Sequence, residues 1–255
     1  MKHTIKDFAA VRNRVVELGK DLKKIFEIEN TKERFKKASN IDIEIENQLV
    51  ITIKQRFSEC EIISEEQYTK NPLTESPTWI LDPISGTTCI RKQQGVFAIV
   101  CSYVINSQVI YALVYDPLGN LVYEALKDDG FYVNKKKHSI CAKKKTNHIL
   151  LNHGTQGVND TLRKSLWSKS LNLNPFVLEK SSALQYCDIA TNKYDYIVTI
   201  SKDNFPYFAA SLIIKEAGGV FSVNNDETRN ISFLDNVFEA AISREVLEEI
   251  NRKLF

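Results

Sequence analysis

WILDPISGTT, residues 79–88, is the stretch that decides the fold of this sequence. Its first three residues form an apolar run typical of a buried strand, and the Asp-Pro pair and Gly-Thr-Thr that follow predict a tight turn at the strand's end. The carboxylate of Asp82 and the hydroxyls of Thr87 and Thr88 are then held in a rigid loop, where functional sites are commonly built. Asp-Pro turns are common, so this stretch alone identifies no function.

Composition narrows the class of protein. The 255 residues suit one large domain or two intimate half-domains. Hydrophobic residues make up 43% and charged residues 26%, which is ordinary for a soluble globular protein. A formal net charge of +2 is too small to indicate direct nucleic-acid binding, which is typical of strongly basic domains. The five scattered cysteines contain no Cys-x-x-Cys pair, and no apolar segment reads as a signal peptide or membrane span, so we expect a cytoplasmic protein without a membrane partner.

The pattern along the chain predicts an α/β protein of layered sheets and helices. Helical spacing covers 4–29 and 43–57, and Asp42 and Glu46 are expected near the start of the second helix, where carboxylates suit the helix dipole. Strands are predicted at 60–64, 78–82, 95–104, 108–116, 120–125 and 130–134, the last four forming an antiparallel meander. Further on, helices are predicted at 181–191, 206–217 and 244–254, with strands at 194–199 and 237–242.

We expect a single domain over 1–255, with a sheet-rich first part at about 1–145 and an alternating second part at about 146–255. No internal repeat or clear linker divides it.

Carboxylates follow two of the predicted strands. Glu65 and Glu66 come after 60–64, and Asp82 ends 78–82. A Glu and an Asp beside an exposed loop carbonyl make an oxygen cage for a hard cation such as Mg²⁺. An acidic pair after a strand is also commonly just solvent-facing, so the set is weak evidence by itself.

The combination is more specific, and it resembles the inositol monophosphatase family. Six segments carry the resemblance: Ile-Asp-Ile-Glu-Ile-Glu at 41–46, Ile-Ser-Glu-Glu at 63–66, Tyr-Asp-Pro at 115–117, Gly-Phe-Tyr-Val-Asn at 130–134, Ser-Ser-Ala-Leu at 181–184, and Ala-Ala-Ser-Leu-Ile-Ile-Lys-Glu-Ala-Gly-Gly at 209–219, together with the Asp-Pro-Ile-x-Gly-Thr-Thr turn. Within the family, Tyr-Asp-Pro and Ser-Ser-Ala-Leu look most like the bacterial extragenic suppressor (SuhB) branch.

The resemblance implies an α-β-α-β-α sandwich, usually dimeric, that works as a Mg²⁺-dependent, Li⁺-sensitive phosphatase. It implies three roles for the residues of this chain. One Mg²⁺ is held by Glu65, Asp82 and the carbonyl of Ile84; Glu65 and Thr87 activate the attacking water; and the backbone N–H groups of Gly86, Thr87 and Thr88 bind phosphate.

The sequence departs from the family pattern at three positions. Ser85 replaces the second Asp of Asp-Pro-Ile-Asp-Gly-Thr, and Phe205-Pro206 replaces Trp-Asp at the start of the last motif. Thr199 falls where the family has a Glu that grips a sugar hydroxyl. Since the carboxylates missing at Ser85 and Pro206 are those that hold a second metal with Asp82, we expect one Mg²⁺ site to be retained and the second to be doubtful.

The residues around Pro206 predict the start of a helix. Pro206 suits the first turn of a helix, with Asp203 or Asn204 as the N-cap. Asp203 is also the only carboxylate near the vacant metal-ligand position.

The sequence is compatible with three functional hypotheses, of which two are enzymes and one is not. One is a Mg²⁺-dependent phosphomonoesterase acting on inositol monophosphate or a similar small ester, with weak or lost activity. Another is a non-catalytic, SuhB-like regulator that acts through protein partners of the transcription machinery in antitermination. The last is a sister activity such as bisphosphate nucleotidase. The resemblance also implies a homodimer.

Overall fold

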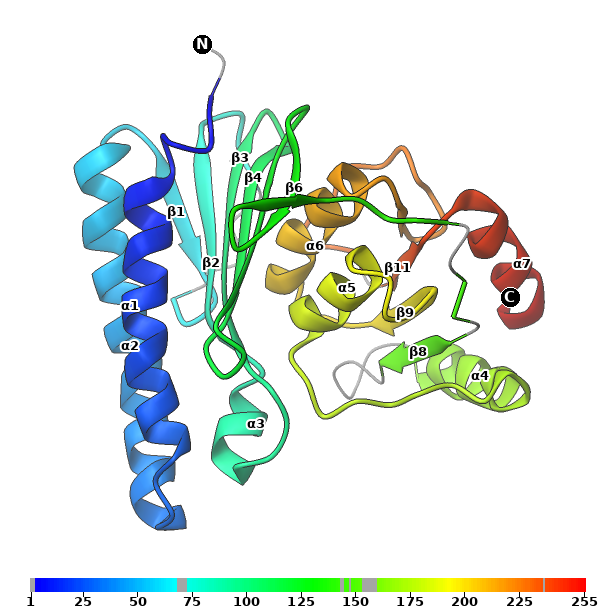
Figure 1. Ribbon diagram of the computed structural model, residues 1–255, viewed down its shortest axis with the longest axis horizontal. Helices are drawn as coiled ribbons and strands as arrows, with labels where there is room; N and C mark the ends of the chain where they lie inside the picture. Colours follow the sequence, from blue (N-terminus) through cyan, green and yellow to red (C-terminus); the bar gives the residue numbers. More distant parts are fainter. Residues whose placement is uncertain (1–2, 68–72, 143–144, 147, 153–159, 236) are drawn as a thin grey trace.

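Two sheets separated by helices organise the computed structural model, which describes residues 3–67, 73–142, 145–146, 148–152, 160–235 and 237–255 (Figure 1). The helices are α1 (Ala9–Phe26), α2 (Thr31–Arg56), α3 (Thr87–Lys92), α4 (Asp160–Ser170), α5 (Ser182–Ala190), α6 (Phe205–Glu216) and α7 (Arg244–Leu254), with a 3₁₀ turn, η1, at Leu171–Leu173. The strands are β1 (Glu61–Ser64), β2 (Thr78–Ser85), β3 (Ala98–Ile105), β4 (Gln108–Asp116), β5 (Leu121–Leu126), β6 (Gly130–Val133), β7 (Lys136–His138), β8 (Ile149–Asn152), β9 (Tyr196–Ile200), β10 (Val220–Val223) and β11 (Val237–Ala241).

The first sheet runs in chain order from β1 to β7. β1 and β2 are parallel, and every later neighbour is antiparallel, so the predicted meander is confirmed. Asn106 and Ser107 form the hairpin turn between β3 and β4, and both have the positive φ (50° and 59°) of a turn that matches strand twist. The sheet continues one strand further than predicted, because β7 pairs with β6 at the edge.

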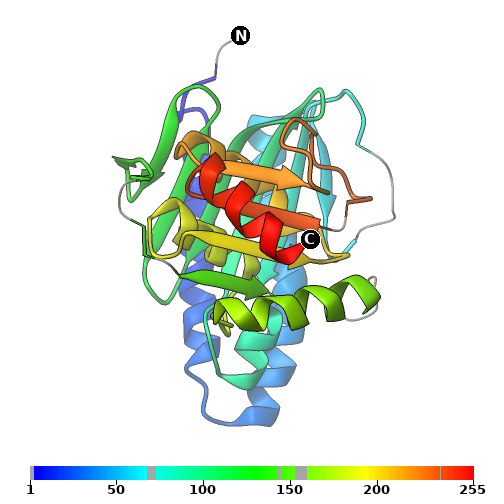
Figure 2. The same cartoon turned by 90° about the vertical axis from the view of Figure 1, so that its right-hand side faces the viewer.

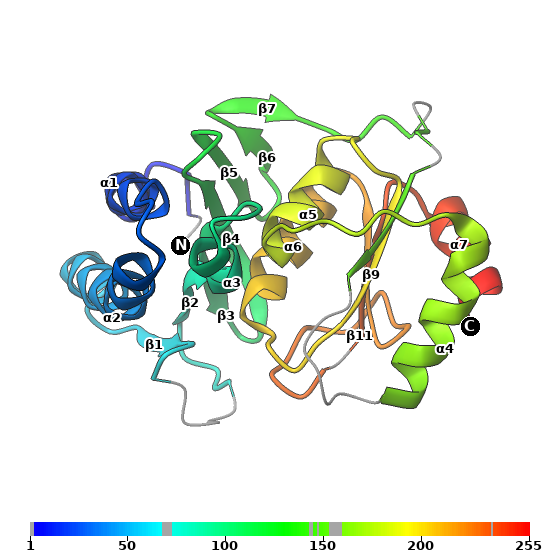
Figure 3. The ribbon, with the colours of Figure 1, turned by 90° about the horizontal axis from the view of Figure 1, so that it is seen from below.

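The layers follow the predicted order. α1 and α2 cover one face of the first sheet, and α5 and α6 fill the space between it and the second sheet, whose strand order is β10-β11-β9-β8 (Figure 3). α4 and α7 cover the outer face of that second sheet, as Figure 2 shows. This α-β-α-β-α sandwich confirms the fold class expected from the sequence.

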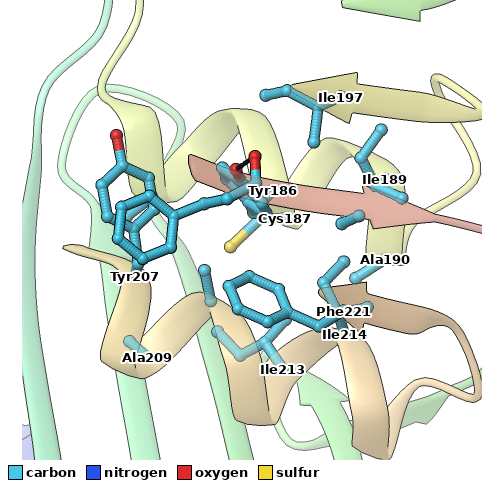
Figure 4. Packing of buried hydrophobic residues seen from close by; sticks show 14 of the residues in the cluster. Tyr186, Cys187, Ile189, Ala190, Ile197, Tyr207, Ala209, Ile213, Ile214 and Phe221 are labelled. Carbon is cyan, nitrogen blue, oxygen red and sulfur yellow. Dashed lines mark hydrogen bonds between the residues drawn. The ribbon is translucent and has the colours of Figure 1, made fainter. Parts of the chain in front are cut away.

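Both faces of β2 are covered, which explains its uninterrupted apolar run. Trp79 and Leu81 belong to the core under α1 and α2, whereas Ile80 belongs to the core between the sheets. In the first core, the ring of Phe8 stacks on that of Tyr111 with 4.0 Å between centroids. In the second, Tyr186 of α5, Tyr207 of α6 and Phe221 of β10 pack around one another (Figure 4).

The second helix was predicted too short. α2 begins at Thr31, where the side chain of Asn30 accepts a hydrogen bond from the N–H of Glu33 (3.1 Å) as its N-cap. Asp42 and Glu46 therefore lie in the middle of the helix, and the predicted interaction with its N-terminal dipole is wrong. The first turns escaped prediction because residues 31–40 are mostly polar and carry no clear apolar stripe.

Strand β2 also extends past its predicted end. It continues through Ser85, with an irregular register against β3 between Asp82 and Ser85. Pro83 lacks an N–H and cannot donate to the ladder, so a local irregularity here is expected. Besides β7 and the turn η1, the elements α3, α4, β8 and β10 were not predicted, because they are short or polar and their apolar pattern is weak. Among the described residues, no helix combines the length and apolar content that a membrane crossing requires.

Candidate active site

Parallel pairing of β1 and β2 brings two acidic residues to one edge of the first sheet. Ser64 lies opposite Leu81, and the N–H of Glu65 donates to the carbonyl of Leu81 (3.1 Å). Because the carboxyl ends of parallel strands meet at the same edge, Glu65 and Asp82 emerge side by side. The structure thus brings together the carboxylates that the sequence placed after two strands.

The turn after β2 is held by its own hydrogen bonds. Gly86 has a φ of +88° and precedes α3, and a Cβ at this position would lie 3.3 Å from the Cα of Ser181. The hydroxyl of Thr87 donates to the carbonyl of Ile84 (3.0 Å). The N–H of Cys89 donates to the carbonyl of Gly86 (2.8 Å). The hydroxyl of Thr87 and the carbonyl of Ile84 are therefore fixed next to each other, whereas Thr88 is exposed.

Asp82 is a buried carboxylate without a hydrogen-bond partner. Its exposed fraction is 1%, and neither of its oxygens has a hydrogen bond of ordinary geometry to any described residue. Burial raises the pKa of Asp82 well above its usual range, and the negative charges of Glu65 and Asp203 raise it further, while a polar contact from Ser85 opposes the shift. An unpartnered carboxylate is costly in the interior, so this position favours a cation as the missing partner.

Glu65 and Asp203 share that environment. Burial, then the charge of Asp203, raises the pKa of Glu65 to about 7, while a polar contact from Asp82 opposes the shift. Burial also raises the pKa of Asp203, against the stabilising N–H of Phe205. Oxygen donors of this kind fit Mg²⁺. In the described ranges no three His, Cys, Asp or Glu side chains are arranged as a ready metal cage.

The loop between β9 and α6 fixes Asp203. The N–H of Asp203 donates to the hydroxyl of Ser201 (3.1 Å), and the N–H of Phe205 donates to Oδ1 of Asp203 (3.2 Å). Asn204 occupies the N-cap position, but its side-chain amide donates to the carbonyls of Ser232 and Asp235, both at 2.9 Å. Of the two predicted cap residues, Asp203 therefore supplies the side-chain oxygen.

The side chains at the three positions that depart from the family pattern are packed or hydrogen-bonded within the protein. The hydroxyl of Ser85 accepts a hydrogen bond from that of Ser181 (2.9 Å). Pro206 is buried in the first turn of α6, as predicted. Thr199 is fully buried and accepts a hydrogen bond from the hydroxyl of Tyr186 (3.3 Å). The ring of Tyr207 stacks on Phe238 with 4.0 Å between centroids, and its hydroxyl lies near Thr199.

Two further carboxylates lie next to this edge of the sheet. Asp42 and Glu46 of α2 are buried, and Glu46 accepts a hydrogen bond from the hydroxyl of Ser64. Burial raises the pKa of Asp42 to about 7, the charge of Glu66 raises it further, and Arg91 opposes the shift. The sequence pointed to these residues through segment 41–46 of the family resemblance, but the misplaced helix start attributed their charges to the helix dipole.

Comparison with known proteins identifies the family. The model of the inositol monophosphatase family matches residues 5–254. The chain belongs to the inositol monophosphatase family. Human inositol monophosphatase 1 is 26% identical over 188 residues, covering 70% of this chain and 68% of the human protein. The Nus factor SuhB of Pasteurella multocida is 24% identical over 220 residues, covering 85% of this chain and 81% of SuhB.

Solved structures of the family share the fold. Inositol monophosphatase II of Staphylococcus aureus superposes with a TM-score of 0.81 at 20% identity, covering 98% of this chain and 94% of that one. The same staphylococcal protein has been solved with inositol monophosphate and with 2′-AMP bound. The predicted family is therefore confirmed, including its SuhB relatives, and members of this inositol monophosphatase family are in general Mg²⁺-dependent.

Proposed function

We propose that this chain is a Mg²⁺-dependent phosphomonoesterase of weak activity, acting on inositol monophosphate or a similar small phosphate ester. The observation that carries the proposal is the unpartnered, buried carboxylate of Asp82, which follows the last residue of β2 that pairs with β1. A chain that kept this fold only as a scaffold has no reason to keep a negative charge there, because an apolar residue of similar size costs less to bury.

In this proposal the residues have the metal-binding, water-activating and phosphate-binding roles that the resemblance implies. Glu65, Asp82 and the carbonyl of Ile84 hold Mg²⁺, which when bound supplies electrostatic stabilisation of the charge that develops on the phosphate. Glu65, whose pKa is raised to about 7 mainly by burial, is suited to accept a proton from the attacking water near neutral pH. The Thr87 hydroxyl donates to Ile84, so its oxygen can accept a hydrogen bond from that water. Backbone N–H groups at 86–88 orient the phosphate.

Weak turnover follows from Ser85 and Pro206. Neither has a carboxylate, so the charge on the leaving oxygen is stabilised less well than in a relative with both carboxylates. Losing one electrostatic contact of this kind typically costs about 10²–10³ in turnover, so we expect activity about a thousandfold below such a relative. The filled space around Thr199 also removes the family's contact to a sugar hydroxyl.

The test measures phosphate release from inositol 1-phosphate, 2′-AMP and a 3′,5′-bisphosphate nucleotide while Mg²⁺ is titrated. We expect slow, Mg²⁺-dependent release from a monoester that is abolished in Asp82→Asn and increased in a Ser85→Asp/Pro206→Asp double variant. Faster release from the bisphosphate nucleotide than from either monoester would identify the chain as a bisphosphate nucleotidase instead. Release that ignores Mg²⁺, or turnover equal to an intact relative, would overturn the proposal.

A second candidate is a regulator that acts through protein partners, favoured by the similarity to the Nus factor SuhB. Filling of the altered positions by hydrogen bonds and packing is compatible with a site released from catalysis. Co-purification of tagged protein with RNA polymerase and Nus factors tests this candidate. If it is right, Asp82→Asn retains these partners while any phosphatase activity disappears.

Three further expectations stay proposals: a cytoplasmic location and a single domain, which rest on the sequence pattern, and a homodimer, which the resemblance implies. Light scattering of the purified protein measures the oligomeric state, and its mass decides between monomer and dimer.

A further inference from the structure

Asp203 is held at the entrance to α6 with its carboxylate fixed at one oxygen. Oδ1 accepts the N–H of Phe205 at 3.2 Å, and the backbone N–H of Asp203 is tied to Ser201. Oδ1 is thereby held by the first residue of α6. A carboxylate with one oxygen anchored can still offer the other to a ligand.

The fold places Asp203 against the same edge as Glu65 and Asp82. Helix α6, which Asp203 precedes, packs on β2, and Asp82 lies on that strand. The negative charge of Asp203 acts on both Glu65 and Asp82. Glu65 directly after β1, Asp82 on β2 and Asp203 on the β9–α6 loop are therefore near enough for their charges to interact.

An independent observation shows that the group lacks a partner. Asp82 is 1% exposed, and both of its oxygens are without hydrogen bonds to the described residues. No Lys, Arg or His is among the groups that set its pKa. A buried carboxylate among like charges needs a bound cation or a retained proton to offset them, so this position can accept a cation.

We propose that Asp203 supplies the third carboxylate of a divalent-cation site with Glu65 and Asp82, in place of the side chains missing at Ser85 and Pro206. The identity of the ion as Mg²⁺ rests on the proposed function. Pro206 has no side-chain oxygen, whereas Asp203 lies on the loop that leads into the same helix. The chain therefore keeps a three-carboxylate set although two of the family's positions have lost theirs.

The competing interpretation is that Asp203 only caps α6. Asp203→Asn separates the two roles, because the amide oxygen still accepts the N–H of Phe205 but the charge is gone. Asp21→Asn is the matched control: Asp21 is exposed on α1, paired with Lys24, and its substitution removes the same charge away from this edge.

The experiment titrates Mn²⁺ and Mg²⁺ into metal-free protein by calorimetry, without substrate. Wild type and Asp21→Asn are expected to bind with equal affinity, and Asp203→Asn at least about tenfold more weakly. In EDTA, Asp203→Asn is expected to melt at or above the wild-type temperature, because repulsion is removed and the cap is kept. Equal cation affinity in wild type and Asp203→Asn, or no saturable binding by wild type, overturns the inference.

The outcomes also separate this inference from the proposed function. Cation binding that depends on Asp203 without phosphate release sustains the cation site and defeats the phosphatase. Mg²⁺-dependent phosphate release together with a cation affinity that is unchanged in Asp203→Asn supports the phosphatase and contradicts the proposed cation site.

Discussion

At the residue scale, the site is governed by negative charges that lack partners. Asp82 is buried with both oxygens unsatisfied, and Glu65 and Asp203 add repulsion. Such a group is stabilised by a cation, by a proton or by loss of its charge. In the metal-free protein the carboxylate that we propose as an ion ligand therefore weakens the fold.

Replacing Asp82 with Asn is expected to stabilise the metal-free protein and abolish its Mg²⁺-dependent activity. The amide has the same shape, carries no charge and can donate to Glu65, so relief of an unsatisfied buried group is worth about 1–3 kcal/mol. Urea denaturation in EDTA measures the free energy of unfolding. A variant less stable than wild type would show that Asp82 has a partner in the native state.

The raised pKa of Asp42 predicts a stability that falls with pH. Burial sets this pKa at about 7, against a usual value of 3.8. Between these values the native carboxyl keeps a proton that the unfolded chain has released, so the native state binds more protons and the free energy of unfolding decreases as pH rises. The decrease is complete above pH of about 7.

Urea denaturation of metal-free protein at pH 5 and pH 8 checks this sign. Asp42→Asn is expected to flatten the dependence, and Glu65, whose pKa is also raised to about 7, accounts for part of the remaining slope. A wild-type stability that rises between the two pH values, or an unchanged slope in Asp42→Asn, contradicts the assignment.

At the element scale, prediction succeeded where the apolar period was strong and failed where it was weak. α7 and the meander follow clear patterns: the bounds of α7 and β4 agree with the sequence, and those of β3, β5 and β6 differ by at most three residues. α4 and β8 have short or polar patterns that packing alone stabilises. The strand ends that carry Glu65 and Asp82 were predicted, but their approach to Asp203 depends on how α6 packs on β2, which no local pattern encodes.

The start of α2 offers a test of an element that the sequence did not reveal. Asn30→Ala removes the oxygen that accepts the N–H of Glu33 and is expected to cost about 1 kcal/mol of stability. Asn30→Ser keeps a capping oxygen and should lose only a few tenths of that amount. Urea midpoints of the three proteins measure the difference, and equal midpoints for Asn30→Ala and wild type would place the helix start elsewhere.

At the scale of the whole molecule, α6 links the two sheets. It packs against β2, β3 and β4 of the first sheet and against β10 of the second, and its residues Phe208, Ile213 and Ile214 are fully buried. Separating the parts at about 1–145 and 146–255 would expose this helix. The candidate site is likewise shared, because Glu65 and Asp82 come from the first part and Asp203 from the second.

We therefore expect the chain to unfold as one cooperative unit, and its two tryptophans report on the two parts. Trp79 is buried in the core under α1 and α2, and Trp167 lies on α4 with 36% of its surface exposed. In Trp167→Phe only Trp79 fluoresces, and in Trp79→Phe only Trp167 does. In each variant the fluorescence transition in urea should coincide with that of far-UV circular dichroism, because loss of either sheet exposes the core that α6 shares. Each variant serves as its own reference, since Trp79→Phe lowers stability by changing a packed core. A fluorescence midpoint that departs from the dichroism midpoint in either variant would mean two half-domains that unfold separately, each with a sufficient core of its own.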